Sequence, residues 1–158
     1  MGLFSFLFPR PVFIGDAVFG QLRRDYFDPR TSKASFINEH LLFAPTGRSI
    51  GLYLDASVHG PTPAQQAFFR NIEWHYDALI PKLIPVIEAG FQDWIPQFSI
   101  RDFAAEFQLT DISIAEIDQP DQLVNWDWSF ETVHDANHVV TIHMRGDTPL
   151  PDGFMLDG

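Results

Sequence analysis

Three of the six histidines lie close together in the segment Trp126 to Arg145, which reads WDWSFETVHDANHVVTIHMR. Imidazole nitrogens and carboxylate oxygens are ligands that zinc accepts in catalytic sites. His134, Asp135 and His138 are therefore candidate metal ligands, and they raise the hypothesis of a small metal-dependent enzyme. The chain has no cysteine, which excludes a thiolate metal site, a disulfide framework and a cysteine nucleophile.

The alternation of apolar and polar residues in this segment predicts a β-hairpin. With residues 135–137 as the loop, His134 faces His138 across the two strands, whereas His143 lies on the opposite face of the sheet. The three imidazoles then cannot meet at one ion. A helix would place His134 and His138 on one face, but the β-branched and aromatic neighbours disfavour a helix. We therefore expect two cross-strand histidines at the tip of the hairpin, with no metal and no cofactor bound.

The same register separates the two faces of the hairpin. Trp128 is expected opposite Met144 on the apolar face, and Asp127 opposite Arg145 on the polar face, where their charges attract. All four tryptophans are expected to be buried in the core: Trp74, Trp94, Trp126 and Trp128.

Other catalytic signatures are scarce. No glycine-rich phosphate loop of P-loop type and no H-E-x-x-H motif occurs in the sequence. Carboxylates are so frequent that spacing alone singles out no general acid and base. We therefore predict no catalytic residue and favour a function other than catalysis.

The net charge is −11, and it is unevenly distributed along the chain. Residues 1–62 contain five acidic and six basic residues, whereas residues 63–158 contain sixteen acidic and four basic residues. Such a surface repels nucleic acids and anionic membranes, and it attracts a basic protein. Acidic residues also keep a protein soluble, so the charge alone does not establish binding. Six acidic residues are the candidate contacts with a basic protein partner: Glu116, Asp118, Asp121, Asp127, Glu131 and Asp135.

The first twelve residues form an apolar segment that includes Leu3, Phe4, Leu7 and Phe8. The segment is too short to span a bilayer, and it lacks the basic residues and the cleavage site of a secretion signal. The myristoylation pattern requires Ser or Thr at position 6, where Phe6 stands. We expect the segment to pack on the protein's own core; a partner surface, a peripheral membrane contact and an oligomerisation role are the alternatives. No transmembrane segment is expected.

Glycine and proline divide the first part of the chain into strands. Three strands are expected as an antiparallel meander, at residues 17–25, 35–43 and 49–56. In the third strand Tyr53 and Asp55 point to one face, and three apolar residues point to the other: Ile50, Leu52 and Leu54.

A long helix is expected from Pro63, because Thr62 can cap it and Gln65 completes a capping box. Pro81 and Pro85 lie inside the apolar pattern of this helix and predict a kink or two abutting helices. A short helix at 100–107, a strand at 109–117, a loop at 118–125 and the hairpin follow, and residues 147–158 are expected to be irregular. The chain is thus predicted to be a single α+β domain, residues 1–158, with an antiparallel sheet of βββ-α-βββ order packed against the proline-kinked helix.

Three motifs resemble those of small bacterial cytoplasmic proteins described only as domains of unknown function, some of the immunity-protein type. They are D-x-V-F-G-x-L at residues 16–22, G-P-T-P-x-Q at the start of the long helix, and W-x-x-x-F with H-x-V-T-I-x-M-x-G at residues 126–146. The resemblance implies a stand-alone module in a bacterial cytoplasm. It implies no catalytic residue.

Charge and resemblance together favour a non-enzymatic module that binds a basic protein, as an immunity protein or antitoxin neutralises a toxin. The alternatives are the metal-dependent enzyme with its site at His134, Asp135 and His138, and a structural or oligomerisation protein that uses residues 3–8.

Overall fold

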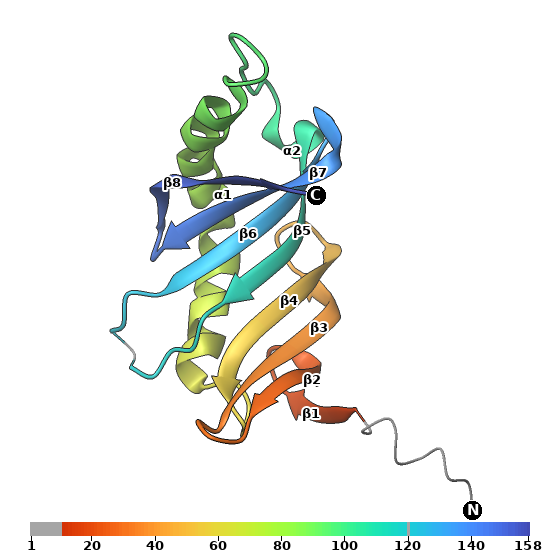
Figure 1. Cartoon of the computed structure of the whole chain (residues 1–158), viewed down its shortest axis with the longest axis vertical. Helices are drawn as coiled ribbons and strands as arrows, with labels where there is room; N and C mark the ends of the chain where they lie inside the picture. Colours follow the sequence, from red (N-terminus) through yellow and green to blue (C-terminus); the bar gives the residue numbers. More distant parts are fainter. Residues whose placement is uncertain (1–10, 120) are drawn as a thin grey trace, which may run out of the picture.

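A mixed β-sheet and one long helix make up the computed structural model, which describes residues 11–119 and 121–158 (Figure 1). The predicted packing of Leu3 to Phe8 lies outside the described residues. Two helices, α1 (Pro63–Phe91) and α2 (Phe103–Glu106), lie between the fourth and fifth strands. The strands are β1 (Val12–Asp16), β2 (Gly20–Asp28), β3 (Lys33–Phe43), β4 (Arg48–Ser57), β5 (Phe107–Ile114), β6 (Asn125–Thr132), β7 (Asp135–Arg145) and β8 (Thr148–Asp157).

The eight strands form one sheet in the order of the sequence. Strands β4 and β5 are parallel, and the other neighbouring pairs are antiparallel. The long connection through α1 explains the parallel pair, because such a crossover returns the chain in its original direction. The predicted α+β class with an antiparallel sheet of βββ-α-βββ order is therefore wrong. The molecule is dominated by an eight-stranded mixed sheet, with four strands before the helices and four after them.

The first extra strand is β1, which lies before the predicted first strand. Residues predicted to open that strand form a turn between β1 and β2 instead. Asp16 Oδ1 accepts hydrogen bonds from the backbone N–H groups of Val18 (2.8 Å) and Phe19 (2.9 Å). Gly20 then has a φ of 68°, a conformation that glycine adopts without strain. A carboxylate that bonds the backbone two residues on is a turn signal, and it overrides the local alternation.

The second extra strand is β8, in the tail that was expected to be irregular because of its prolines. Pro149 and Pro151 are both part of this strand. β8 is the last strand of the sheet, so among the described residues one of its sides has no neighbouring strand. Prolines are tolerated in such an edge strand because the missing N–H groups need not join a ladder.

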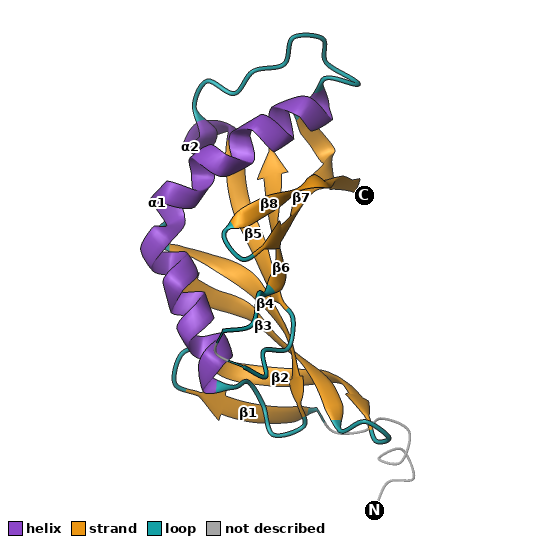
Figure 2. Ribbon diagram, turned by 90° about the vertical axis from the view of Figure 1, so that its left-hand side faces the viewer, coloured by secondary structure: helices purple, strands orange, loops and turns teal. Residues whose placement is uncertain are grey.

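Helix α1 is continuous over 29 residues and bows around one face of the sheet (Figure 2). The predicted capping box is present: Gln65 N–H donates to Thr62 Oγ1 (3.2 Å), and Thr62 N–H donates to Gln65 Oε1 (3.0 Å). Pro81 and Pro85 bring no break in the helix, and both side chains are exposed. A proline inside a helix costs about 3 kcal/mol. Burial of the apolar face of α1 against the sheet offsets that cost.

The core lies between α1 and the face of the sheet that α1 covers. Trp126 and Trp128 are buried there, as predicted. Trp74 and Trp94 are exposed instead, so that part of the prediction is wrong. Trp74 is two residues from Ile72, which faces the sheet, and two residues are about half a turn of a helix.

The opposite face of the sheet carries no helix among the described residues, and we call it the open face (Figure 2). Side chains alternate along the strands, so each strand that contributes apolar residues to the core also contributes polar residues to the open face. Within the described ranges, no helix is both long and apolar enough to cross a bilayer.

Candidate functional site

The hairpin of β6 and β7 is present, but its turn lies two residues earlier than predicted. Thr132 pairs with Asp135, so Val133 and His134 form the turn. The backbone N–H of His134 donates to Thr132 Oγ1 (3.3 Å). Trp128 consequently pairs with Ile142 and not with Met144. A shift of two residues keeps each side chain on its predicted face, so the two tryptophans stay in the core.

The three histidines of this hairpin each contact a different carboxylate. His134 Nε2 lies 2.7 Å from Glu106 Oε2, and His138 Nδ1 lies 2.8 Å from Asp135 Oδ2. His143 Nδ1 lies 2.6 Å from Asp127 Oδ1. Asp127 therefore faces His143 and not Arg145, which pairs with Asn125.

The structure brings Asp135 and His138 together but gives His134 a separate partner. No group of three or more His, Asp or Glu side chains that could hold a metal ion is found in the described part of the chain. The pKa of Asp135 is lowered, mainly because its carboxylate accepts a hydrogen bond from the Asn137 backbone and then because it contacts His138. These contacts organise the turn.

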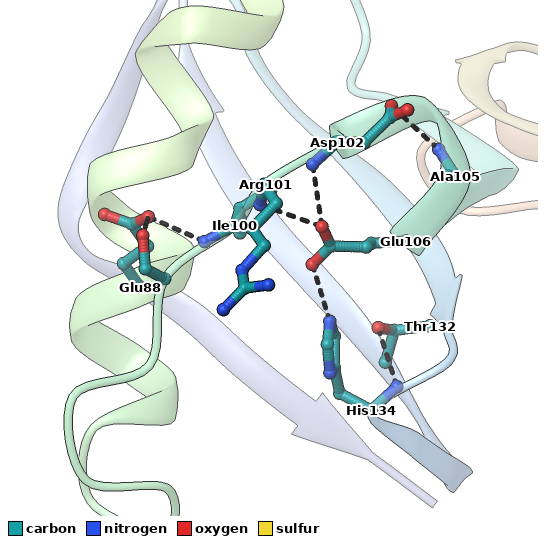
Figure 3. Close-up of polar contacts among 9 residues, drawn as sticks. Glu88, Ile100, Arg101, Asp102, Ala105, Glu106, Thr132 and His134 are labelled. Carbon is teal, nitrogen blue, oxygen red and sulfur yellow. Dashed lines mark hydrogen bonds and ion pairs between the residues drawn. The ribbon is translucent and has the colours of Figure 1, made fainter.

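The contact between Glu106 and His134 joins α2 to the hairpin (Figure 3). Glu106 Oε1 accepts hydrogen bonds from the backbone N–H groups of Arg101 (2.8 Å) and Asp102 (2.7 Å). These bonds and the contact with His134 lower the pKa of Glu106. The His134 ring also packs edge-to-face on Phe98, with ring centroids 4.8 Å apart. Both oxygens of this carboxylate already bind groups of the chain itself, so we regard the cluster as structural.

The open face of the sheet brings together side chains from strands far apart in the sequence. One row of partners crosses it from β2 to β7: Arg23, Ile37, Tyr53, Ser113, Asp127 and His143. A second row runs from β4 to β8: Gly51, Asp111, Ser129, Thr141 and Met155. Both rows cross the parallel pair β4 and β5 near the middle of the sheet, where they lie two residues apart along each strand.

Gly51 and Asp111 form the centre of the open face. A Cβ atom on Gly51 would overlap with the carboxylate of Asp111, so glycine lets this carboxylate lie across the neighbouring strand. Tyr53 is beside them and is 42% exposed. Its pKa is raised, first by partial burial and second by the charge of Asp111. The phenol therefore stays neutral and can donate a hydrogen bond.

The charge of the open face is predominantly negative. Arg23 lies on this face, but its guanidinium contacts both Asp25 and Glu39 at 3.1 Å. Lys33 contacts Glu116 at 2.8 Å. No ion pair with Lys or Arg is found among the described residues for three further acidic residues of this face: Asp55, Asp111 and Glu131. A partner could therefore bind these carboxylates without first breaking an internal ion pair.

The six predicted contact residues do not form one cluster. Asp127 and Glu131 lie on the open face, in β6. Asp118 and Asp121 lie in the connection between β5 and β6, and Asp135 lies at the hairpin turn. Glu116 follows β5, where it contacts Lys33.

Sequence reasoning missed Asp111, Asp55 and Glu39. The signal was present, because the alternation in β4 already places Tyr53 and Asp55 on the face opposite the core. The parallel pairing that sets Asp111 beside Gly51 depends on residues 60 positions apart in the chain, and no local pattern reveals it.

A serine nucleophile motif was also missed. Residues 47–51 read G-R-S-I-G, which matches the G-x-S-x-G spacing of hydrolases. That motif works at a sharp turn from a strand into a helix. Here it opens strand β4, where Ser49 pairs with Leu42 in a β-hairpin. Ser49 and His40 line one shallow hollow, but no hydrogen bond between them is found in the described part of the chain.

Comparison with known proteins identifies no relative. No protein-family model matches the chain, and no curated protein and no solved structure was found to be similar to it. Function must therefore be inferred from the chain's own residues and their arrangement.

Proposed function

We propose that the protein is a non-enzymatic binding module whose open face recognises a basic protein. The observation that supports this most directly is the position of Asp55, Asp111 and Glu131. These carboxylates lie on a sheet face that no helix covers among the described residues, and no internal Lys or Arg pairs with them there.

The shape of the open face suits a protein partner better than a small molecule. A sheet face presents a broad surface, whereas small molecules bind in enclosed, mostly apolar cavities. Tyr53 and Ile37 provide apolar area near the centre, with carboxylates around them. A central aromatic residue surrounded by polar groups is the usual arrangement of an interface that binds tightly.

The acidic face would act mainly on the rate of association. Complementary charges steer a basic protein toward its binding site, and salt weakens this attraction. Neutralisation of a basic toxin, as by an immunity protein in a bacterial cytoplasm, is the role that we favour among such interactions.

The proposal can be tested by capturing partners from the native lysate on immobilised protein, at low and at high salt. Wild type is compared with the variant D55N/D111N/E131Q and with the control variant D93N/D121N/D152N. The control removes the same number of negative charges away from the centre of the open face.

We expect a basic protein that wild type and control retain at low salt, and that the open-face variant loses. Equal retention of that protein by wild type, the open-face variant and the control would contradict a role for the open face. Retention of the same protein by wild type at high salt, without loss, would contradict an electrostatic mode of binding.

A further inference from the structure

The most exposed tryptophan of the described chain lies on α1, on the side away from the sheet. Trp74 is 86% exposed and lies in the middle third of the helix. Figure 2 shows that α1 bows outward at its middle. A bowed helix meets a flat or convex neighbour at this part first. Exposed tryptophan is costly in water and is enriched at the centres of protein interfaces.

A hollow of about 580 Å³ lies directly beside this tryptophan. It is formed by one flank of α1 and the turn between β3 and β4, and Trp74 is one of its walls. The other lining residues are Ala44, Pro45, Arg70, Glu73, Tyr76 and Asp77.

The hollow is held open by the fold. Glu73 Oε1 accepts a hydrogen bond from the backbone N–H of Ala44 (3.1 Å), which fixes the helix to the turn. The Tyr76 ring packs edge-to-face on Phe43, with centroids 5.4 Å apart, and it also contacts Trp128. The site for an incoming side chain therefore exists before binding.

We propose that a second copy of this chain occupies the hollow, and that two α1 helices cross to form a symmetric dimer. In a two-fold interface each copy offers the same surface, so a protruding group and the pocket that receives it must both be present on one chain. Trp74 is the protruding group, and the hollow beside it is the pocket. Each Trp74 inserts between Arg70 and Asp77 of the other copy.

The charges around Trp74 match this symmetry. Arg70 lies one helical turn before the midpoint between Glu73 and Trp74, and Asp77 lies one turn after it. An antiparallel two-fold axis at this midpoint places each Arg70 opposite the partner's Asp77. Within one chain these two residues are two turns apart, about 10 Å along the helix, so they do not pair with each other. The indole ring would also lie against the partner's Arg70, a favourable cation–π arrangement.

The net charge of −11 makes two copies repel each other, and this repulsion is smallest when their acidic faces point apart. The acidic open face lies on the side of the sheet opposite α1 (Figure 2). Two copies joined through α1 would therefore direct their open faces away from each other. The dimer does not depend on the function proposed above, and it would leave both open faces accessible.

The first test is sedimentation velocity over a range of protein concentrations. We expect a species of twice the 18.0 kDa chain mass, and a monomer for Trp74→Ala. Loss of a central tryptophan should weaken dimerisation by roughly 30-fold or more, the effect of a 2 kcal/mol hot spot. Trp94→Ala is the matched control, because Trp94 is 61% exposed but lies beyond the end of α1.

Wild type that remains a monomer at every concentration would overturn the proposal. So would a dimer that Trp74→Ala leaves unchanged. Circular dichroism of both variants is measured to show that a change from dimer to monomer does not come from unfolding.

The second test uses charge reversal and mixing. Arg70→Asp gives a chain with an acidic group at both paired positions, 70 and 77, and Asp77→Arg gives one with a basic group at both. Each variant alone should be a monomer, and an equal mixture should form a heterodimer. The pair Arg30→Asp and Asp152→Arg, on exposed residues elsewhere, should leave the wild-type dimer intact. Failure of the first pair to combine, with both variants folded, would exclude the proposed pairing.

Discussion

At the scale of single residues, the histidines that suggest a metal site are better explained by local structure. Each of the three contacts its own carboxylate, and two of those carboxylates also bind backbone N–H groups. The residues that we assign to binding, by contrast, have no such local partners within the described structure. Asp111 and Glu131 are examples. Engagement of a polar group by its own chain thus separates structural from functional candidates better than residue type does.

The first residue-scale prediction concerns Glu106. Its folded-state pKa is lowered from 4.5 by the backbone bonds and by His134, so the charged carboxylate stabilises the fold. Glu106→Gln should lower the free energy of unfolding at pH 7 by about 1 kcal/mol, the usual size of such a contact. Because the folded pKa is depressed, this difference is fully present above about pH 4.5, shrinks below it, and is lost as the pH falls through the lower folded-state pKa.

Urea denaturation at pH 7 and pH 4 measures the effect. A Glu106→Gln variant equally destabilised at both pH values would show that the carboxylate's charge is not responsible.

The second residue-scale prediction concerns Tyr53. Partial burial and the charge of Asp111 raise its pKa above 10.0. The ultraviolet titration difference between wild type and Tyr53→Phe should therefore have its midpoint above pH 10. In the Asp111→Asn background that midpoint should fall but stay above the ordinary value, because burial is the larger cause. A midpoint that does not respond to Asp111→Asn would place the carboxylate away from the phenol.

At the scale of elements, the sequence predicts those features that depend on interactions between residues close together in the chain. Three such features are the capping box at Thr62, the antiparallel pairing of β3 with β4, and the apolar face of the β6–β7 hairpin. The continuity of α1 does not follow from such interactions, because it depends on burial against the sheet. Strand β8 shows the same limit: Pro149 and Pro151 are acceptable only because this strand is at the edge.

The element-scale prediction concerns Gln65, which is 0% exposed. Its Nε2 group donates to the backbone oxygens of Asp55 (2.8 Å) and Ala115 (3.1 Å), and so it ties the start of α1 to the ends of β4 and β5. Gln65→Leu leaves both oxygens without this donor and should cost about 2–3 kcal/mol of unfolding free energy. Thr62→Ala, which removes the cap, should cost about 1 kcal/mol.

Thermal and urea unfolding of the two variants test this order. A Gln65→Leu variant as stable as wild type would mean that water replaces the amide and that the link between α1 and the parallel strands is unimportant.

At the scale of the whole molecule, α1 and the sheet divide the surface into two sides with different properties. The helix side carries Trp74 with charges of both signs around it, and the open face carries Tyr53 and an excess of carboxylates. The net acidity is evident from the sequence, but its position is not. It depends on the parallel pairing of β4 with β5, which joins the two halves of the chain and is set by the crossover through α1.

The most direct test of the central claim is the association rate of a captured basic partner as a function of ionic strength. Wild type and the control D93N/D121N/D152N should associate fast at low salt and slow steeply as salt is added. The open-face variant D55N/D111N/E131Q should associate at least ~10-fold more slowly at low salt, with a flatter salt dependence, because steering charges act mainly on the association rate. Equal rates and equal salt dependence for the open-face variant and the control would show that the open face does not guide binding.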